Sequence, residues 1–190
     1  QIPFVAVGKF PDDDVVQVDH DNVGACKELV TVLFAKGIQN IAYLGSNMDQ
    51  MVNRCRYQGY EEAYRKGKRK LNQDLVYTDL SSRAMVEKAV EELKNSGVEC
   101  ILCQDDYICD EVVRKLARMG VRIPDQMKVA SCHYSRILEN YPITITSLKF
   151  NITELGRRSC QVLLDMIHGK TVPDKTLLDY EIILKESTKG

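Results

Sequence analysis

The sequence lacks the excess of basic residues that a protein gripping nucleic acid needs. Its 190 residues include 26 Lys and Arg against 27 Asp and Glu, which gives a net charge of -1. A nucleic-acid-binding face is built from clustered positive charge. We therefore do not expect this chain to contact DNA or RNA by itself.

Long apolar runs are missing as well. No stretch approaches the roughly 20 apolar residues that span a bilayer. No basic segment precedes Gln1-Ile2-Pro3-Phe4 as it would in a signal peptide. The sequence thus predicts neither a membrane partner nor a secretory leader, and it begins as if cut from the middle of a longer chain.

Motifs for catalysis, metals and cofactors are also missing. Cys100-x-x-Cys103 has no second cysteine pair or neighbouring histidine to complete a tetrahedral metal site. Neither a Gly-x4-Gly-Lys phosphate loop nor a Gly-x-Gly-x-x-Gly motif occurs. Asp19 and Asp21 resemble an acid–base pair, but a strand end and a helix cap explain them better. We expect no catalytic residue, no metal and no cofactor.

The residues that are present describe a globular protein. Hydrophobic residues make up 44% and charged residues 28% of the chain, which is typical of a folded domain. The seven cysteines are odd in number and show no disulfide-scaffold spacing. Such thiols are typical of reduced cytosolic proteins. We therefore expect a cytoplasmic protein with one ordinary domain or two small lobes.

Strand-like and helix-like segments alternate along the chain. Short apolar runs typical of strands lie at residues 4–7, 15–18, 41–44, 75–77, 100–103, 129–132, 143–146 and 177–184. Apolar residues at helical spacing lie at 23–34, 57–64, 84–93, 106–119 and 152–167. This alternation predicts an α/β fold with parallel sheets flanked by helices. Ligands bind such sheets at the carboxyl ends of the strands, where polar segments follow at 19–22, 45–56, 79–82, 104–107 and 133–136.

These polar segments belong to a recognisable pattern. It begins with Val18-Asp19-His20-Asp21-Asn22-x-Gly24 and continues with Arg56-x-x-Gly59-Tyr60-x-x-Ala63 and Cys103-Gln104-Asp105-Asp106. It ends with Pro142-x-x-Thr144-x-Thr146-Ser147 and Leu155-Gly156. In order and spacing, these motifs resemble nearly end to end the effector-binding core of LacI/GalR-type bacterial transcription regulators.

The resemblance implies a two-lobed, periplasmic-binding-protein-like fold with three crossovers and a small-molecule effector, such as a sugar or sugar acid, in the cleft between the lobes. The N-terminal lobe is expected to be incomplete and to hold residues 1–39 and 147–170. The C-terminal lobe is expected to hold residues 40–146 and 171–190. The resemblance also implies a homodimer that reaches operator DNA only through a headpiece absent from this chain. No enzymatic reaction is expected.

Arg56 is the first effector-binding residue that the resemblance implies. A guanidinium forks to ligand hydroxyls or a carboxylate through rigid, charge-assisted hydrogen bonds. The alternative is a solvated arginine at a helix start, like Arg54. Asp105 takes the ligand position after the strand at 100–103, and Asp106 takes the helix-cap position. The alternative is that both aspartates only cap the helix and interact with its dipole.

His133 occupies a position where many sugar-binding members of the family have an aspartate. An imidazole can donate, accept or carry charge near neutral pH, so the effector is expected to be acidic or unusual for the family. The alternative is a structural histidine. Gln50, Val52 and Leu80 fall at further family pocket positions, and Leu80 replaces a common aromatic ring.

Two other functions compete with this interpretation. A periplasmic-type sugar-binding protein of an ABC transporter has the same two-lobed fold, but the seven cysteines argue against export. A small α/β enzyme would work at the same strand ends. It would need an activated nucleophile or a matched acid–base pair, and neither is found in the sequence.

Overall fold

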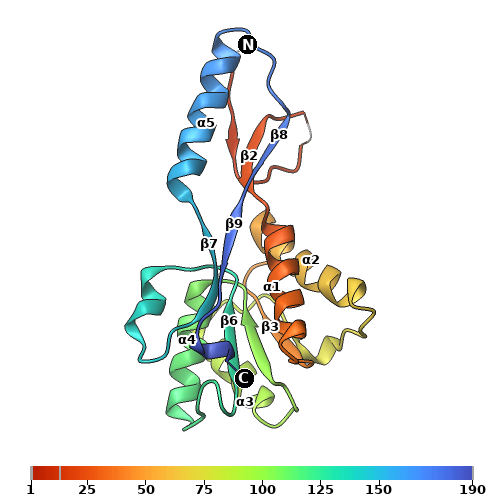
Figure 1. Ribbon diagram of the computed structural model, residues 1–190, viewed down its shortest axis with the longest axis vertical. Helices are drawn as coiled ribbons and strands as arrows, with labels where there is room; N and C mark the ends of the chain where they lie inside the picture. The colour runs from red at the N-terminus through yellow and green to blue at the C-terminus, as the bar shows by residue number, and fades with distance from the viewer. Residues whose placement is uncertain (1, 13, 190) are drawn as a thin grey trace.

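The computed structural model describes residues 2–12 and 14–189. It has a broad lower part and a slender upper part (Figure 1). The helices in the described ranges are α1 (Asn22–Ala35), α2 (Met51–Lys66), α3 (Arg83–Leu93), α4 (Asp106–Arg118) and α5 (Ile152–Ile167), with short 3-10 turns η1 (Gln73–Leu75), η2 (Arg136–Asn140) and η3 (Glu186–Thr188). The strands are β1 (Ala6–Val7), β2 (Gln17–His20), β3 (Ile41–Leu44), β4 (Val76–Tyr77), β5 (Cys100–Cys103), β6 (Lys128–Ser131), β7 (Thr146–Phe150), β8 (Lys175–Leu178) and β9 (Tyr180–Ile183).

The strands form two sheets, one in each lobe. The larger sheet has the order β4-β3-β5-β6-β7-β9, and its neighbouring strands are parallel except for the antiparallel pair β7–β9. The smaller sheet, β1-β2-β8, is parallel throughout. The predicted α/β fold with two lobes and mainly parallel sheets is confirmed.

The central strands of the large lobe are continuous apolar runs, because both of their faces are buried in its core. Every residue of β3 and β5 is buried, because helices cover both faces of a parallel sheet. Residues of α3 and α4 pack in the cluster on one face, and residues of α1 and α2 pack in the cluster on the other. Cys100 and Cys103 belong to opposite clusters, as expected for strand residues three apart.

Polar caps gather at one edge of the sheets. The side chains of Asp21, Ser82, Asp105 and Asn151 each accept a hydrogen bond from a backbone N–H in the first turn of the helix that follows. These bonds satisfy donors that the helix itself leaves unpaired. Because α1, α4 and α5 begin directly after β2, β5 and β7, their caps lie close to the ends of these strands.

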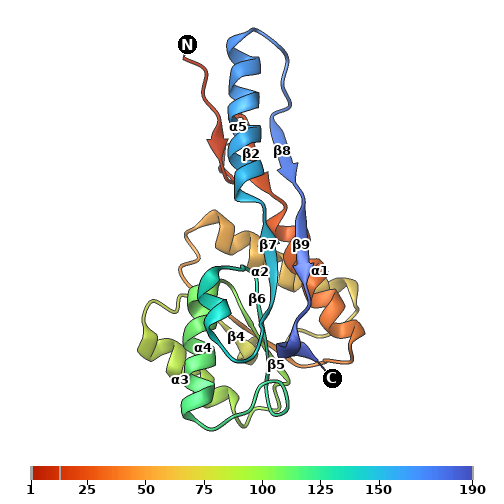
Figure 2. The same ribbon diagram turned by 60° about the vertical axis from the view of Figure 1, so that its left-hand side comes forward.

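The small lobe consists of the three-stranded sheet and α5, which stands alongside it (Figure 2). Several of its apolar side chains are exposed, among them Val7, Ile167 and Leu177. The chain passes from one sheet to the other after β2, between β7 and α5, and between β8 and β9. These three crossings are the crossovers implied by the sequence.

The crossings differ in position from the predicted lobe boundaries. Residues 22–39 were expected in the N-terminal lobe, but the apolar face of α1 is buried in the large lobe, where Gly59 of α2 packs tightly against the backbone of Val23. Residues 147–150 also lie in the larger sheet, within β7, whereas residues 175–178 form β8 in the smaller one. An amphipathic pattern shows which helix face is buried, but it does not show which sheet covers that face.

Candidate functional site

Arg56 lies on α2 beneath the junction of the lobes and is only 8% exposed. Its Nε donates to Oδ1 of Asn22 at 3.3 Å, and its Nη1 donates to the backbone oxygen of Gln104 at 3.0 Å. These partners stand at the start of α1 and just after β5. A guanidinium has five N–H donors, and within the described ranges Nη2 has no hydrogen-bond acceptor and no carboxylate lies within ion-pair distance. Arg56 is thus held in place with donors left for a ligand.

The ring of Phe150, the last residue of β7, gathers three side chains around it. The guanidinium carbon of Arg56 lies 5.9 Å from the ring centroid, within the range of a cation–π interaction. The His133 ring stacks on it at 6.3 Å with an interplanar angle of 17°, and the His20 ring lies 4.9 Å away. Phe150 therefore connects the predicted residues Arg56 and His133 with the end of β2.

His133 is paired with a carboxylate. Its Nδ1 lies 3.1 Å from Oδ1 of Asp106, whose side chain is buried. Burial acts to raise the pKa of Asp106, but hydrogen bonds from His133 and Ser135 outweigh it, and the net pKa is lowered. Asp106 is therefore a carboxylate at neutral pH and fixes the orientation of the His133 ring.

The helix-cap role predicted for Asp106 belongs to the neighbouring Asp105. Asp105 has an extended backbone, and its Oδ1 accepts a hydrogen bond from the Ile108 N–H at 2.9 Å, which makes Asp105 the cap of α4. Asp106, expected to be the cap, is the first residue of the helix and pairs with His133 instead. An Asp-Asp pair does not reveal from composition alone which residue precedes the first helical turn.

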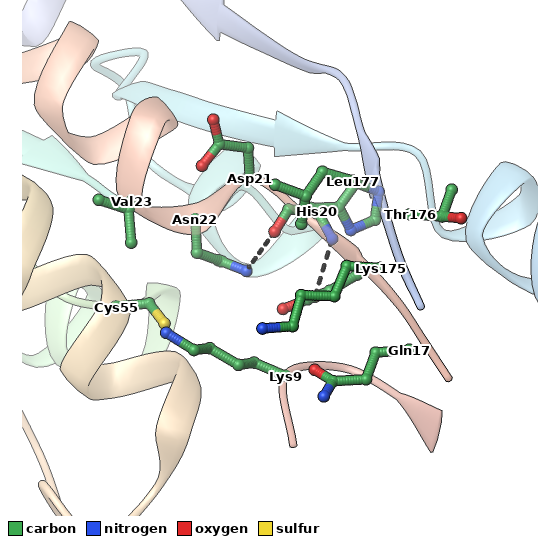
Figure 3. Close-up of a pocket in the computed structure, with 11 residues that line it drawn as sticks. Lys9, Gln17, His20, Asp21, Asn22, Val23, Cys55, Lys175, Thr176 and Leu177 are labelled. Carbon is green, nitrogen blue, oxygen red and sulfur yellow. Dashed lines mark hydrogen bonds between the residues drawn. The ribbon is translucent and has the colours of Figure 1, made fainter. Parts of the chain in front are cut away.

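A cavity of about 190 Å³ lies between the small sheet and the N-terminal parts of α1 and α2. Figure 3 shows its lining, with the ammonium of Lys9 reaching the thiol of Cys55. Burial raises the pKa of the Cys55 thiol and the pKa of the Asp19 carboxyl. The lining residues are Lys9, Gln17, Asp19, His20, Asp21, Asn22, Val23, Cys55, Lys175, Thr176 and Leu177.

A buried polar network around Gln104 fixes one of the two hydrogen-bond partners of Arg56. The side chain of Gln104 is fully buried; its Oε1 accepts from the Ser46 N–H at 3.0 Å, and its Nε2 donates to the Ser46 hydroxyl at 3.1 Å. Asn53 of α2 also donates to that hydroxyl at 3.2 Å. Because buried polar groups need such partners, the network fixes the Gln104 backbone that holds Arg56.

The structure brings some of the predicted site residues together and leaves others apart. Arg56 and His133 meet on Phe150. Gln50 is exposed before α2, Val52 is half-buried in its first turn, and Leu80 packs into the core of the large lobe. Leu80 and Asp105 share a shallow surface hollow. None of the predicted site residues lines the 190 Å³ cavity.

Sequence reasoning missed Asn22, Phe150 and Lys9 as parts of this junction. Asn22 entered the sequence analysis only as part of a motif, and Phe150 lies beyond the strand predicted at residues 143–146. Lys9 lies in the loop after the first apolar run. Its position after Gly8 at a strand end was the one available signal.

The described residues contain neither a candidate metal-ligand cluster nor a candidate membrane-spanning helix. No group of three or more His, Cys, Asp or Glu side chains in those ranges could hold a metal ion. No helix placed by the structure combines the length and the apolar character needed to cross a membrane.

Residues 30–188 match the family model of the periplasmic binding protein-like domain. The chain is 27% identical to the HTH-type transcriptional regulator CelR of Thermobifida fusca, over 98% of this chain and 56% of the regulator. It is 27% identical to the HTH-type transcriptional regulator GntR of Escherichia coli strain K12, over 93% of this chain and 54% of the regulator. The chain thus spans about half the length of these relatives.

Solved structures agree. A complex of the transcriptional regulator CelR with cellobiose has a TM-score of 0.85 at 26% identity and covers 97% of this chain and 58% of that one. A regulatory protein of the LacI family from Chloroflexus aggregans has a TM-score of 0.87, with coverage of 97% and 68%; at 22% identity it shows the fold alone.

Two lobes joined by crossing strands, with polar side chains at the strand ends, define a ligand-binding domain. The chain belongs to the periplasmic binding protein-like domain family, in the form found in LacI-family transcription regulators. Its curated relatives are transcription regulators and not enzymes.

Proposed function

We propose that this chain is the effector-sensing core of a LacI-type transcription regulator and binds a small polar molecule, a sugar or a sugar acid, at the junction of its lobes. The observation that carries the proposal is Arg56, a buried guanidinium with unpaired donors at the carboxyl ends of parallel strands. The cellobiose bound by the relative CelR supports the sugar class.

The proposed contacts come from both lobes. Arg56, His133 and Asp105 belong to the large lobe, whereas Lys9 and Asp19 face the junction from the small one. Gln50, Val52 and Leu80 complete the proposed set at its periphery. A ligand that touches both lobes stabilises the closed arrangement by its higher affinity for that arrangement.

In the whole regulator, closure would change the spacing of two DNA-binding headpieces across a homodimer. The chain itself has a net charge of -1, so operator DNA would be contacted by a separate basic domain. A cytoplasmic location belongs to the same proposal, because gene regulation requires access to DNA.

A thermal-shift screen tests the proposal. Cellobiose, glucose, gluconate and glucose 6-phosphate are added singly to the purified chain, and binding is confirmed by calorimetry. A ligand specific for the folded state raises stability by about 2.7 kcal/mol at 100 times its Kd. At least one probe is expected to raise the Tm in the chain and in the Arg54→Ala control, whose side chain is exposed. If no member of a broad sugar and sugar-acid panel changes the Tm, the proposal is wrong.

A further inference from the structure

In the described part of the protein no carboxylate forms an ion pair with Arg56, and its charge acts on the Asp19 carboxyl only at longer range. Its guanidinium is 8% exposed, and its two hydrogen bonds go to the neutral acceptors of Asn22 and Gln104. A buried cation is normally paired with an anion, because removal from water costs free energy that neutral acceptors only partly recover. The face of Phe150 at 5.9 Å offers only a weak attraction.

A second cation approaches from the opposite lobe. Lys9 follows β1 of the small sheet, and its ammonium lies beside the thiol of Cys55, the residue before Arg56 on α2 (Figure 3). In the ranges that the structure covers, no carboxylate lies within ion-pair distance of the Lys9 ammonium. Asn22 lines the same cavity as Lys9 and accepts a hydrogen bond from Arg56. One residue of the cavity lining therefore connects the two cations.

The acidic groups of the cavity are already engaged. Asp21 accepts the Gly24 N–H at 2.8 Å as the cap of α1. Asp19 accepts the His20 N–H at 2.8 Å, and its burial disfavours the charged form. Both lining carboxylates thus already accept a backbone N–H, and the amine of Lys9 lies in the same lining.

We infer that the effector of this chain carries a carboxylate or a phosphate, and that this anion is bound between Lys9 of the small lobe and Arg56 of the large lobe. The inference rests on the proposed function and narrows its ligand class. An anion between two cations from different lobes attracts both, so it also favours closure. The cellobiose named in the CelR complex is neutral, and this chain is expected to differ in preference.

Matched pairs of probes test the inference by calorimetry on the purified chain. Cellobiose is compared with cellobionate, and glucose with gluconate and glucose 6-phosphate, so that carboxylate and phosphate are separated. In at least one pair the charged member is expected to bind at least about tenfold more tightly, the worth of one charge-assisted hydrogen bond. Lys9→Gln is expected to remove that preference, because it weakens binding of the charged member more than binding of the neutral one. Lys36→Gln, an exposed lysine at the far end of α1, is the control and should keep it.

A second variant tests Arg56 without removing it. Asn22→Asp places a carboxylate at the position 3.3 Å from the Arg56 Nε. This carboxylate competes with an anionic ligand for Arg56, so the affinity for the charged probes is expected to fall by about tenfold relative to that for their neutral partners. If neutral sugars bind as tightly as their charged partners, or if Lys9→Gln weakens both equally, the inference is wrong and the proposed function stands. If no probe in a broad panel binds, both are wrong.

Discussion

The Nε of Arg56 donates to Oδ1 of Asn22, and the Nδ2 of Asn22 donates to the backbone oxygen of His20 at 3.2 Å. One amide side chain therefore links an arginine of the large lobe to the last residue of a strand in the small lobe. This link lies where the chain first crosses between the lobes. Asn22 therefore fixes the position of the Arg56 guanidinium relative to this first crossing between the lobes.

Replacing Asn22 with alanine is expected to lower the free energy of unfolding by about 1–3 kcal/mol, because it removes an acceptor from a buried guanidinium. Urea unfolding measures the change. Asn140→Ala, at an exposed position at the end of η2, should change it by less than about 0.5 kcal/mol. Equal effects of the two substitutions would contradict the role assigned to Asn22.

Close packing between α1 and α2 gives a second prediction. A Cβ at Gly59 would lie 2.4 Å from the backbone oxygen of Val23, so Gly59→Ala must push the helices apart and is expected to cost at least about 2 kcal/mol. Gly156→Ala on α5 meets no atom within 4 Å and should be neutral or stabilising by up to about 1 kcal/mol. Thermal and urea unfolding compare the two. A harmless Gly59→Ala would show that α1 does not pack in the large lobe as described.

The pairing of Asp106 with His133 predicts a dependence of stability on pH. The pKa of Asp106 is lowered on folding, so its carboxylate stabilises the folded state above the unfolded pKa of about 3.9. This contribution is lost as the pH falls through the folded pKa. The stability difference between the wild type and Asp106→Asn should therefore be constant near neutral pH and shrink in acid. Urea unfolding at a series of pH values measures this stability difference. A difference that grows in acid would contradict the predicted direction.

Thiol reactivity offers a fourth prediction. Cys160 is exposed, whereas the other six cysteines are buried and none is in a disulfide. Burial also raises the pKa of the Cys26 and Cys55 thiols, which slows their reaction. An Ellman assay on the folded chain should report one fast thiol, absent in Cys160→Ser, and all seven after denaturation. Several fast thiols in the folded chain would contradict the packing of the core.

The sequence was sufficient for the alternating strands and helices, because these depend on local periodicity. Arg56 and His133 were selected from the family resemblance, and their contact with an effector stays a prediction. The sequence was not sufficient for the lobe that holds α1, which depends on the contact between Gly59 and Val23. It also did not separate Asp105 from Asp106, since the cap is set by backbone conformation. Phe150 became part of the site only when β7 placed its ring between Arg56 and His133.

The most direct test of the account is a calorimetric titration of Arg56→Ala beside Arg54→Ala, using the tightest ligand from the screen. Both variants are first shown to be folded by circular dichroism. We predict that Arg56→Ala weakens binding by at least about tenfold, whereas Arg54→Ala retains the wild-type affinity. Unchanged affinity in a folded Arg56→Ala variant would contradict the claim that Arg56 holds the effector between the lobes.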